Sequence, residues 1–133
     1  MQRRMIYNGV FLDDPKELLQ WWIAQGFFMP KGAEVKCHHM TRAFKPKGEE
    51  QNLPYGDKTK VKVVGVAYTP QIGTVVVECS TPSRNRVKHI TVWVDGIPPS
   101  KSNDLLEEGY QEVSGPTLSG RVGYFDGEMV RTD

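Results

Sequence analysis

The sequence predicts one α+β domain with about six strands and two helices. Runs of branched and aromatic residues alternate with turns that contain glycine or proline, a pattern typical of strands. Two other segments carry the apolar spacing or the capping residues of helices. A chain of 133 residues suits a single domain and can bury a core without a metal or disulfide staple, so 1–133 is treated as one unit.

Strand-like segments follow one another along most of the chain. We expect strands at 5–12, 34–44, 60–69, 72–80, 89–95 and 118–125. The third and fourth are separated only by Pro70 and Gln71, which predicts a hairpin. A polar loop at 45–59 and a basic loop at 81–88 interrupt the series, and a short helix is expected within 96–109.

The longer helix is predicted over 13–26. Asp13 or Asp14 can cap its first turn, and Pro15 suits that turn because proline lacks the amide hydrogen that the turn leaves unused. Gly26 suits its end. The apolar residues between these signals recur at helical spacing and predict one buried stripe.

Charge and cysteine content narrow the function classes. The formal net charge is only +1, so contact with a nucleic acid would need a local basic patch rather than bulk charge. Cys37 and Cys79 form no CxxC pair and are expected to be reduced, buried thiols. No apolar run reaches the roughly 20 residues that cross a bilayer. We therefore expect no membrane contact and a cytoplasmic location.

A His-x-Thr pattern occurs twice, as HMT at 39–41 and as HIT at 89–91, in a chain with only three histidines. Both copies fall on predicted strands. Residues two apart on a strand point to the same face, so each copy presents an imidazole and a hydroxyl together. The apolar middle residue of each copy should point into the core. Side by side, the two strands would line a cleft with two imidazoles and two hydroxyls.

This set of side chains suits the cleavage of a phosphodiester. One of His39 and His89 can accept a proton from the nucleophile while the other donates a proton to the leaving oxygen. The hydroxyls of Thr41 and Thr91 can donate hydrogen bonds to the phosphate oxygens, where charge develops. The chemistry requires no metal or other cofactor. The residues alone do not decide which histidine is the acid, or whether water or a ribose 2′-hydroxyl attacks.

The two motifs resemble the hallmark of the two-histidine (2H) phosphoesterase superfamily, which includes the LigT-like cyclic phosphodiesterases. The opening MIYNGVFLDDP and the stretch HITVWVDGIPPSKSNDLL are also similar to this group. The resemblance implies a compact bilobal fold, with two mostly antiparallel sheets facing a central cleft and two helices outside. The chain departs from the family pattern at Arg42, where an apolar residue is usual, and in the short spacing between its two motifs.

In size, the chain is most similar to the 2H nucleases of phages that degrade cyclic-oligonucleotide immune signals (anti-CBASS nucleases). That resemblance implies an enzyme of the host cytoplasm whose substrate is a cyclic oligonucleotide. The wider superfamily implies a nucleotide or a short RNA, including 2′,3′-cyclic phosphates. No obligate protein partner is inferred.

Further residues are candidates for substrate contacts near the motifs. Tyr7 could stack on a base, and Trp93 shares the strand parity of the second motif and could wall the same cleft. Arg84, Arg86 and Lys88 precede that motif and could guide a phosphate, although a solvated loop is an equal reading.

The two residues directly before the first motif, Cys37 and His38, are not expected to take part in catalysis. His38 should point to the opposite strand face from His39, outside direct catalysis. Cys37 shares the face of His39 and could border the cleft, although packing is the better interpretation. The alternative functions are a non-catalytic sponge or sensor for cyclic nucleotides and, less favoured, a metal-binding β-rich domain using Cys37, His39, Cys79 and His89.

Overall fold

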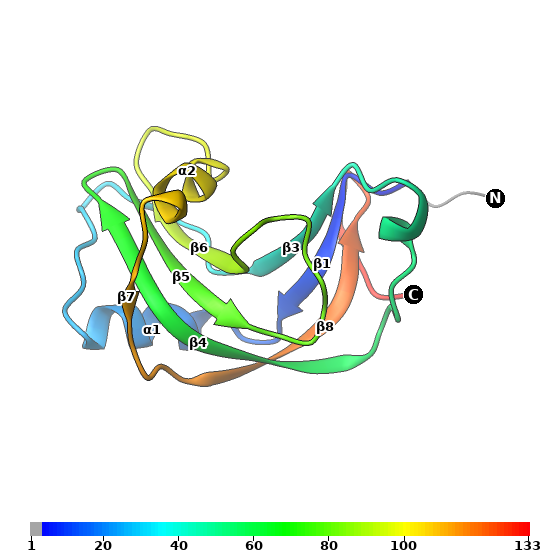
Figure 1. The fold of residues 1–133 in the computed structure, drawn as a ribbon, viewed down its shortest axis with the longest axis horizontal. Helices are drawn as coiled ribbons and strands as arrows, with labels where there is room; N and C mark the ends of the chain where they lie inside the picture. The colour runs from blue at the N-terminus through cyan, green and yellow to red at the C-terminus, as the bar shows by residue number, and fades with distance from the viewer. Residues whose placement is uncertain (1–3) are drawn as a thin grey trace.

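Residues 4–133 fold into nine antiparallel strands and two helices, which confirms the α+β class (Figure 1). The computed structural model describes residues 4–133. The elements in chain order are β1 (Tyr7–Leu12), α1 (Pro15–Ala24), β2 (Glu34–Val35), β3 (His39–Phe44), the 3-10 turn η1 (Gly48–Gln51), β4 (Lys58–Thr69), β5 (Ile72–Glu78), β6 (His89–Val94), α2 (Lys101–Glu107), β7 (Gln111–Glu112), β8 (Thr117–Phe125) and β9 (Val130–Arg131).

The strands form one sheet rather than the two expected. Their order is β2-β6-β5-β4-β8-β1-β3, with β7 paired to β4 and β9 paired to β8. The long strand β4 joins the two halves because its beginning pairs with β8 and the rest pairs with β5. Figure 1 shows β4 running along the base of the molecule from the half that holds β1, β3 and β8 to the half that holds β5 and β6. The two lobes are therefore the two ends of one curved sheet.

The segment predicted as one strand, 34–44, is split between the two ends of the sheet. Its first part pairs with β6, and the amide of Cys37 still donates to the carbonyl of Thr91 at 2.9 Å. One residue later, the carbonyl of His38 accepts from the amide of Leu12 at 2.9 Å, at the start of the pairing with β1. Cys37 has φ +60°, a left-handed conformation that is uncommon outside glycine. This turn separates β3 from β6 and opens the space between them.

A β-bulge follows each His-x-Thr motif. In β3, Thr41 pairs with Gly9 and Ala43 pairs with Asn8, which leaves Arg42 as the extra residue. In β6, Thr91 pairs with Thr74 and Trp93 pairs with Gly73, which leaves Val92 as the extra residue. A bulge shifts the alternation of side chains beyond it. Arg42 is half-buried, and no hydrogen bond of its buried Nε is recorded among residues 4–133, whereas Val92 is fully buried in the core.

The core lies on one face of the sheet and is covered by α1. Met40 and Ile90, the middle residues of the two motifs, are fully buried there together with Leu18 and Trp22 of α1. The helix begins as predicted, since Asp14 accepts a hydrogen bond from the amide of Lys16 at 3.1 Å.

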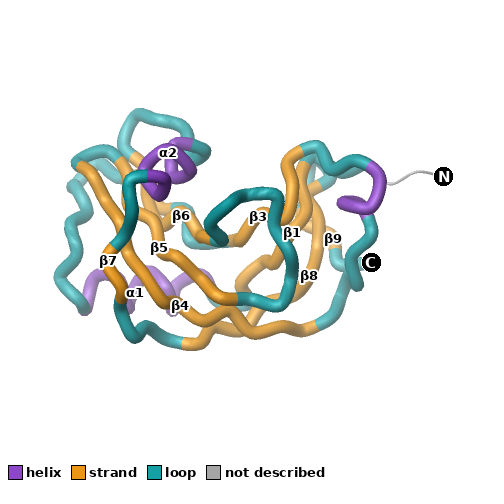
Figure 2. Tube along the Cα trace, viewed as in Figure 1, coloured by secondary structure: helices purple, strands orange, loops and turns teal. Residues whose placement is uncertain are grey.

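The second helix differs from the prediction. The helix α2 packs on the other face of the sheet, where Leu106 contacts Val76 and Ala67 in a smaller cluster. It is capped by Ser100 without a side-chain hydrogen bond, and it borders the cleft instead of lying outside it. Figure 2 shows the loop between β5 and β6 arching toward β3 on this face. No helix within residues 4–133 is long and apolar enough to cross a membrane.

Candidate active site

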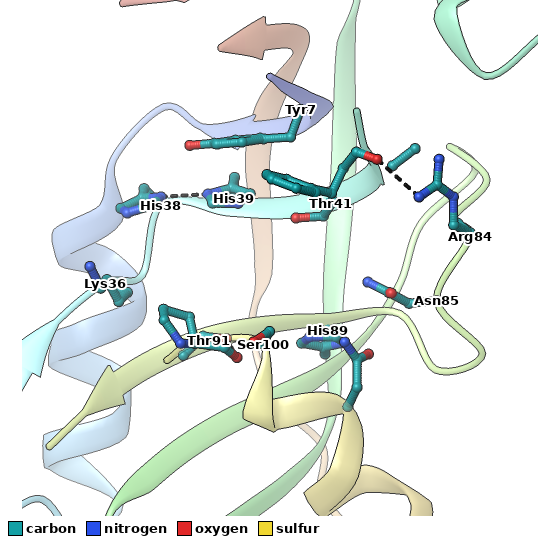
Figure 3. A pocket seen from close by; sticks show the side chains of 14 residues that line it. Tyr7, Lys36, His38, His39, Thr41, Arg84, Asn85, His89, Thr91 and Ser100 are labelled. Atoms are coloured by element: carbon teal, nitrogen blue, oxygen red, sulfur yellow. Dashed lines mark hydrogen bonds between the residues drawn. The ribbon is translucent and has the colours of Figure 1, made fainter. Parts of the chain in front are cut away.

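A cavity of about 420 Å³ lies between β3, β6 and the start of α2 (Figure 3). All four side chains of the His-x-Thr motifs line it. The first motif enters from β3 and the second from β6, so the strands are brought together from opposite ends of the sheet. The lining residues are Tyr7, Lys36, His38, His39, Thr41, Ala43, Phe44, Arg84, Asn85, His89, Thr91, Pro99, Ser100 and Asn103.

His39 is held in a stack of rings. The ring of Tyr7 stacks on the ring of His39, with 4.6 Å between the centroids and 19° between the planes. The centroid of the Phe11 ring lies 5.4 Å from that of His39. His38 adds a further ring at 4.6 Å and 16°. Burial is the largest cause that lowers the pKa of His39, and together with the positive charges that His38, His89 and Lys36 can carry it brings this pKa to about 3. His39 is therefore neutral at physiological pH in the free protein.

His38 lies in the cavity and not on the opposite face, so the sequence-based prediction for this residue is wrong. Its Nδ1 lies 2.5 Å from Nδ1 of His39, the hydrogen bond drawn in Figure 3. The strand β3 begins only at His39, and the left-handed turn at Cys37 lies directly before His38, so the alternation of a strand does not apply there. Cys37 packs in the core instead, with its thiol donating to the carbonyl of Val92 at 3.5 Å.

His89 has a backbone partner instead of a second imidazole. Its Nδ1–H donates to the carbonyl oxygen of Val87 at 2.8 Å. Because a carbonyl can only accept, this contact assigns the hydrogen of the neutral ring to Nδ1 and leaves Nε2 with the lone pair. Burial lowers the pKa of His89, and the hydrogen bond to Val87 opposes that change.

The two threonine hydroxyls also have different surroundings. Oγ1 of Thr91 lies 2.9 Å from the hydroxyl of Ser102, which is fully buried, and 3.4 Å from the carbonyl of Pro99. For the hydroxyl of Thr41, the structure of residues 4–133 records no hydrogen bond, while its carbonyl accepts from the hydroxyl of Ser83 at 2.7 Å. Thr91 is thus anchored before any ligand binds, and Thr41 is free to donate.

The side chain of Arg84 links the β5–β6 loop to the rim of the cavity through hydrogen bonds. Its Nε and Nη2 donate to the two carboxylate oxygens of Glu50 at 2.8 and 2.6 Å, and its Nη1 donates to the carbonyl of Phe44 at 2.9 Å. The hydrogen bonds from Arg84 and from the amide of Lys47 are the main causes that lower the pKa of Glu50 to about 2. The charge of Arg84 is therefore matched within the protein, and its first effect is to hold the loop.

Comparison with protein families shows what the chain is similar to. The model of the fungal tRNA ligase phosphodiesterase domain covers residues 33–129, which include both motifs and most of the chain. The chain belongs to this family. The match supports the two-histidine phosphoesterase superfamily inferred from the motifs. No curated protein and no solved structure matches the chain.

In this member of the phosphodiesterase domain family, some of the expected substrate residues lie away from the cavity. Trp93 is fully buried in the core, so its assignment to the cleft wall is wrong, because the bulge at Val92 reverses the alternation after Thr91. Lys88 does not line the cavity, and its Nζ donates to the carbonyl of Cys79 at 2.6 Å. Arg86 lines a neighbouring cavity.

Other lining residues were not found from the sequence. Lys36, Asn85, Ser100 and Asn103 belong to loops or to a helix start, where no periodic pattern indicates which way a side chain points. The alternative metal site is not assembled: no group of three or more His, Cys, Asp or Glu side chains within residues 4–133 is arranged to hold a metal ion.

Proposed function

We propose that this domain hydrolyses nucleotide 2′,3′-cyclic phosphates, at an RNA end or on a free nucleotide, by histidine acid–base catalysis. The observation that carries the proposal is the convergence of His39, Thr41, His89 and Thr91 on one cavity, in a chain that belongs to a phosphodiesterase family. These residues supply a base, an acid and two hydroxyl donors for one phosphate.

The unequal partners of the histidines favour His39 as the base. Nδ1–H of His39 can donate to Nδ1 of His38, which leaves Nε2 as the proton acceptor. Burial and nearby positive charge keep the pKa of His39 low, so the ring is in the neutral form that a base requires, and a bound phosphate has to raise this pKa for the proton transfer. Tyr7 holds the plane of the ring through the stacked contact.

His89 is then the acid. The carbonyl of Val87 accepts from Nδ1–H and so stabilises the imidazolium, which is the form that donates. A phosphodiester in the cavity brings a negative charge, and this raises the pKa of both histidines relative to the free protein. The difference between their partners keeps His89 easier to protonate than His39.

The hydrolysis proceeds in one step. Water attacks the phosphorus while His39 takes one of its protons, and the bond between phosphorus and one ribose oxygen breaks. His89 gives its proton to that oxygen, which becomes a free hydroxyl, and the other ribose oxygen keeps the phosphate as a monoester. Thr41 and Thr91 donate to the non-bridging oxygens, where negative charge builds up.

The test is incubation of the protein with a substrate panel in the presence of EDTA. The panel contains nucleoside 2′,3′-cyclic phosphates, linear oligoribonucleotides, cyclic dinucleotides and cyclic trinucleotides. We expect hydrolysis of the 2′,3′-cyclic phosphates to monoesters. Cyclic oligonucleotides, the other substrate class predicted from the sequence, stay a prediction that the same panel measures. Tight binding with every ligand recovered intact would instead indicate the sponge or sensor.

A further inference from the structure

A second cavity of about 440 Å³ adjoins the active site on the side of α2. It shares three lining residues with the first cavity: Arg84, Asn85 and Asn103. The remaining lining residues are Arg86, Val87, Leu106, Glu107, Gly109 and Tyr110. Cavities of this size are within the range of small-ligand sites, which begins at roughly 300 Å³. The two cavities therefore form adjoining compartments with polar side chains at their junction.

The junction carries unoccupied hydrogen-bonding groups. The side-chain amides of Asn85 and Asn103 line both cavities, and no hydrogen bond of either amide is recorded among residues 4–133. An amide NH₂ group can donate to a phosphate oxygen. Arg84, the third shared residue, has its guanidinium taken by Glu50 and Phe44, so it fixes the wall and leaves binding to its neighbours.

The second cavity itself combines a cation and an exposed aromatic ring. Arg86 is exposed, and within the described part of the chain no ion pair or hydrogen bond of its side chain is recorded. Tyr110 is 43% exposed, and its ring lies against the bare backbone of Gly65, where an added Cβ would lie 2.5 Å from a ring carbon. Glu107 offers a carboxylate that can accept from a base or a ribose hydroxyl.

A cation and an aromatic ring beside a phosphate-cleaving cavity are the groups that single-stranded nucleic-acid sites use. We infer that the second cavity binds the nucleotide that precedes the reacting one when the substrate is an oligoribonucleotide ending in a 2′,3′-cyclic phosphate. Asn85 and Asn103 then contact the phosphate between the two nucleosides, Arg86 supplies positive charge, and Tyr110 stacks on the base. This inference rests on the proposed function and adds the direction in which the substrate extends.

The experiment compares two substrates that differ by one nucleotide. These are a nucleoside 2′,3′-cyclic phosphate and the dinucleotide that ends in the same cyclic phosphate. We expect wild type to show the higher kcat/KM for the dinucleotide. Arg86→Ala and Tyr110→Ala should each lower kcat/KM for the dinucleotide by about tenfold, the scale of one stacked base or one charged contact, and leave the mononucleotide unchanged.

Matched controls separate these effects from general damage. Tyr110→Phe keeps the ring and should keep the preference for the dinucleotide. Lys16→Ala removes a positive charge from α1, which lines neither cavity, and should leave kcat/KM unchanged for both substrates. Equal kcat/KM for the two substrates, or equal losses on both in Arg86→Ala and Tyr110→Ala, would overturn the inference.

A binding measurement separates this inference from the proposed function. Calorimetric titration of His39→Ala uses a 3′-phosphorylated dinucleotide and the matching 3′-mononucleotide as probes. Tighter binding of the dinucleotide that is lost with Arg86→Ala supports the second cavity even if wild type hydrolyses neither cyclic phosphate. Hydrolysis by wild type without any dinucleotide advantage in rate or binding refutes the second cavity and leaves the proposed function standing.

Discussion

The two His-x-Thr motifs have nearly the same backbone and different partners. In each, the histidine is the first residue of its strand, the middle residue is buried, and a bulge follows the threonine. Yet His39 lies among three rings and contacts a second imidazole, whereas His89 donates to a backbone carbonyl. The shared backbone brings equivalent groups to one cavity, and the unequal partners allow one imidazole to accept a proton and the other to donate it.

The same contrast holds for the hydroxyls. Thr91 is anchored by the buried Ser102, while the side chain of Thr41 has no recorded partner within residues 4–133. To donate to the phosphate, Thr91 has to turn its one hydrogen away from the carbonyl of Pro99 while Ser102 donates to its oxygen, whereas the hydroxyl of Thr41 is free to follow the ligand. The comparison suggests one rigid half of the site and one adaptable half, and the following variants test that division.

Removal of either imidazole should have the largest effect. His39→Ala and His89→Ala are each expected to lower kcat for a 2′,3′-cyclic phosphate by at least about 100-fold, because each loses one proton-transfer group. Steady-state kinetics measure the loss, and circular dichroism with thermal melting checks the fold. A variant that is folded and cleaves at the wild-type rate would remove that histidine from the mechanism.

Removal of a threonine hydroxyl should come next. Thr41→Val and Thr91→Val keep the branched shape and are each expected to lower kcat by about tenfold to 100-fold, as loss of one donor to developing charge does. Ser102→Ala should lower kcat by less than either threonine substitution, because Ser102 acts only by positioning Thr91. In the Thr91→Val background, Ser102→Ala should therefore have no further effect on kcat. An undiminished effect in that background would mean that Ser102 acts independently of Thr91.

A change at His38 should alter the pH profile more than the maximal rate. The positive charge that His38 can carry lowers the pKa of His39, so its removal in His38→Ala should raise that pKa. The acidic limb of kcat/KM, on which the base loses activity as it is protonated, should then move to higher pH. An acidic limb that stays in place or moves to lower pH would show that His38 does not act on His39 through charge.

A further prediction concerns stability instead of rate. His39 has an ordinary pKa of 6.5 and a pKa of about 3 in the folded protein. Between these values the unfolded chain binds the proton and the folded protein does not, so the free energy of unfolding should fall as pH decreases from about 6.5 toward 3. His39→Phe, which cannot be protonated, should show a smaller decrease in urea titrations across that range. An unchanged pH dependence in this variant would contradict the neutral, buried state of His39.

Periodicity predicted most of the elements, and it also predicted the buried and exposed sides of both motifs up to the threonine. Met40 and Ile90 are buried as alternation requires, and α1 begins at the aspartate cap. Two-residue strands such as β7 and β9 have no pattern of their own, because they exist only through their pairing with β4 and β8. Their absence from the prediction is a consequence of tertiary pairing.

The residues that were misplaced lie where the alternation of a strand breaks. His38 follows the left-handed Cys37, and Trp93 follows the bulge at Val92. Neither a positive φ at a cysteine nor a bulge at a valine is indicated by the type of residue. The sequence signals near the two bulges are Gly9 and Gly73, where a side chain would not fit. An added Cβ would lie 2.0 Å from the carbonyl oxygen of Met40 at Gly9 and 2.2 Å from the indole nitrogen of Trp93 at Gly73.

The most direct test of the central claim is the coupling between the two histidines. The measurement is the rate of hydrolysis of a nucleoside 2′,3′-cyclic phosphate in EDTA by wild type, His39→Ala, His89→Ala and the double variant. If both act on one phosphate in one step, the double variant should be about as slow as the slower single variant, because groups that act as a unit are not additive. Losses that multiply in the double variant, or activity that EDTA abolishes, would contradict the account.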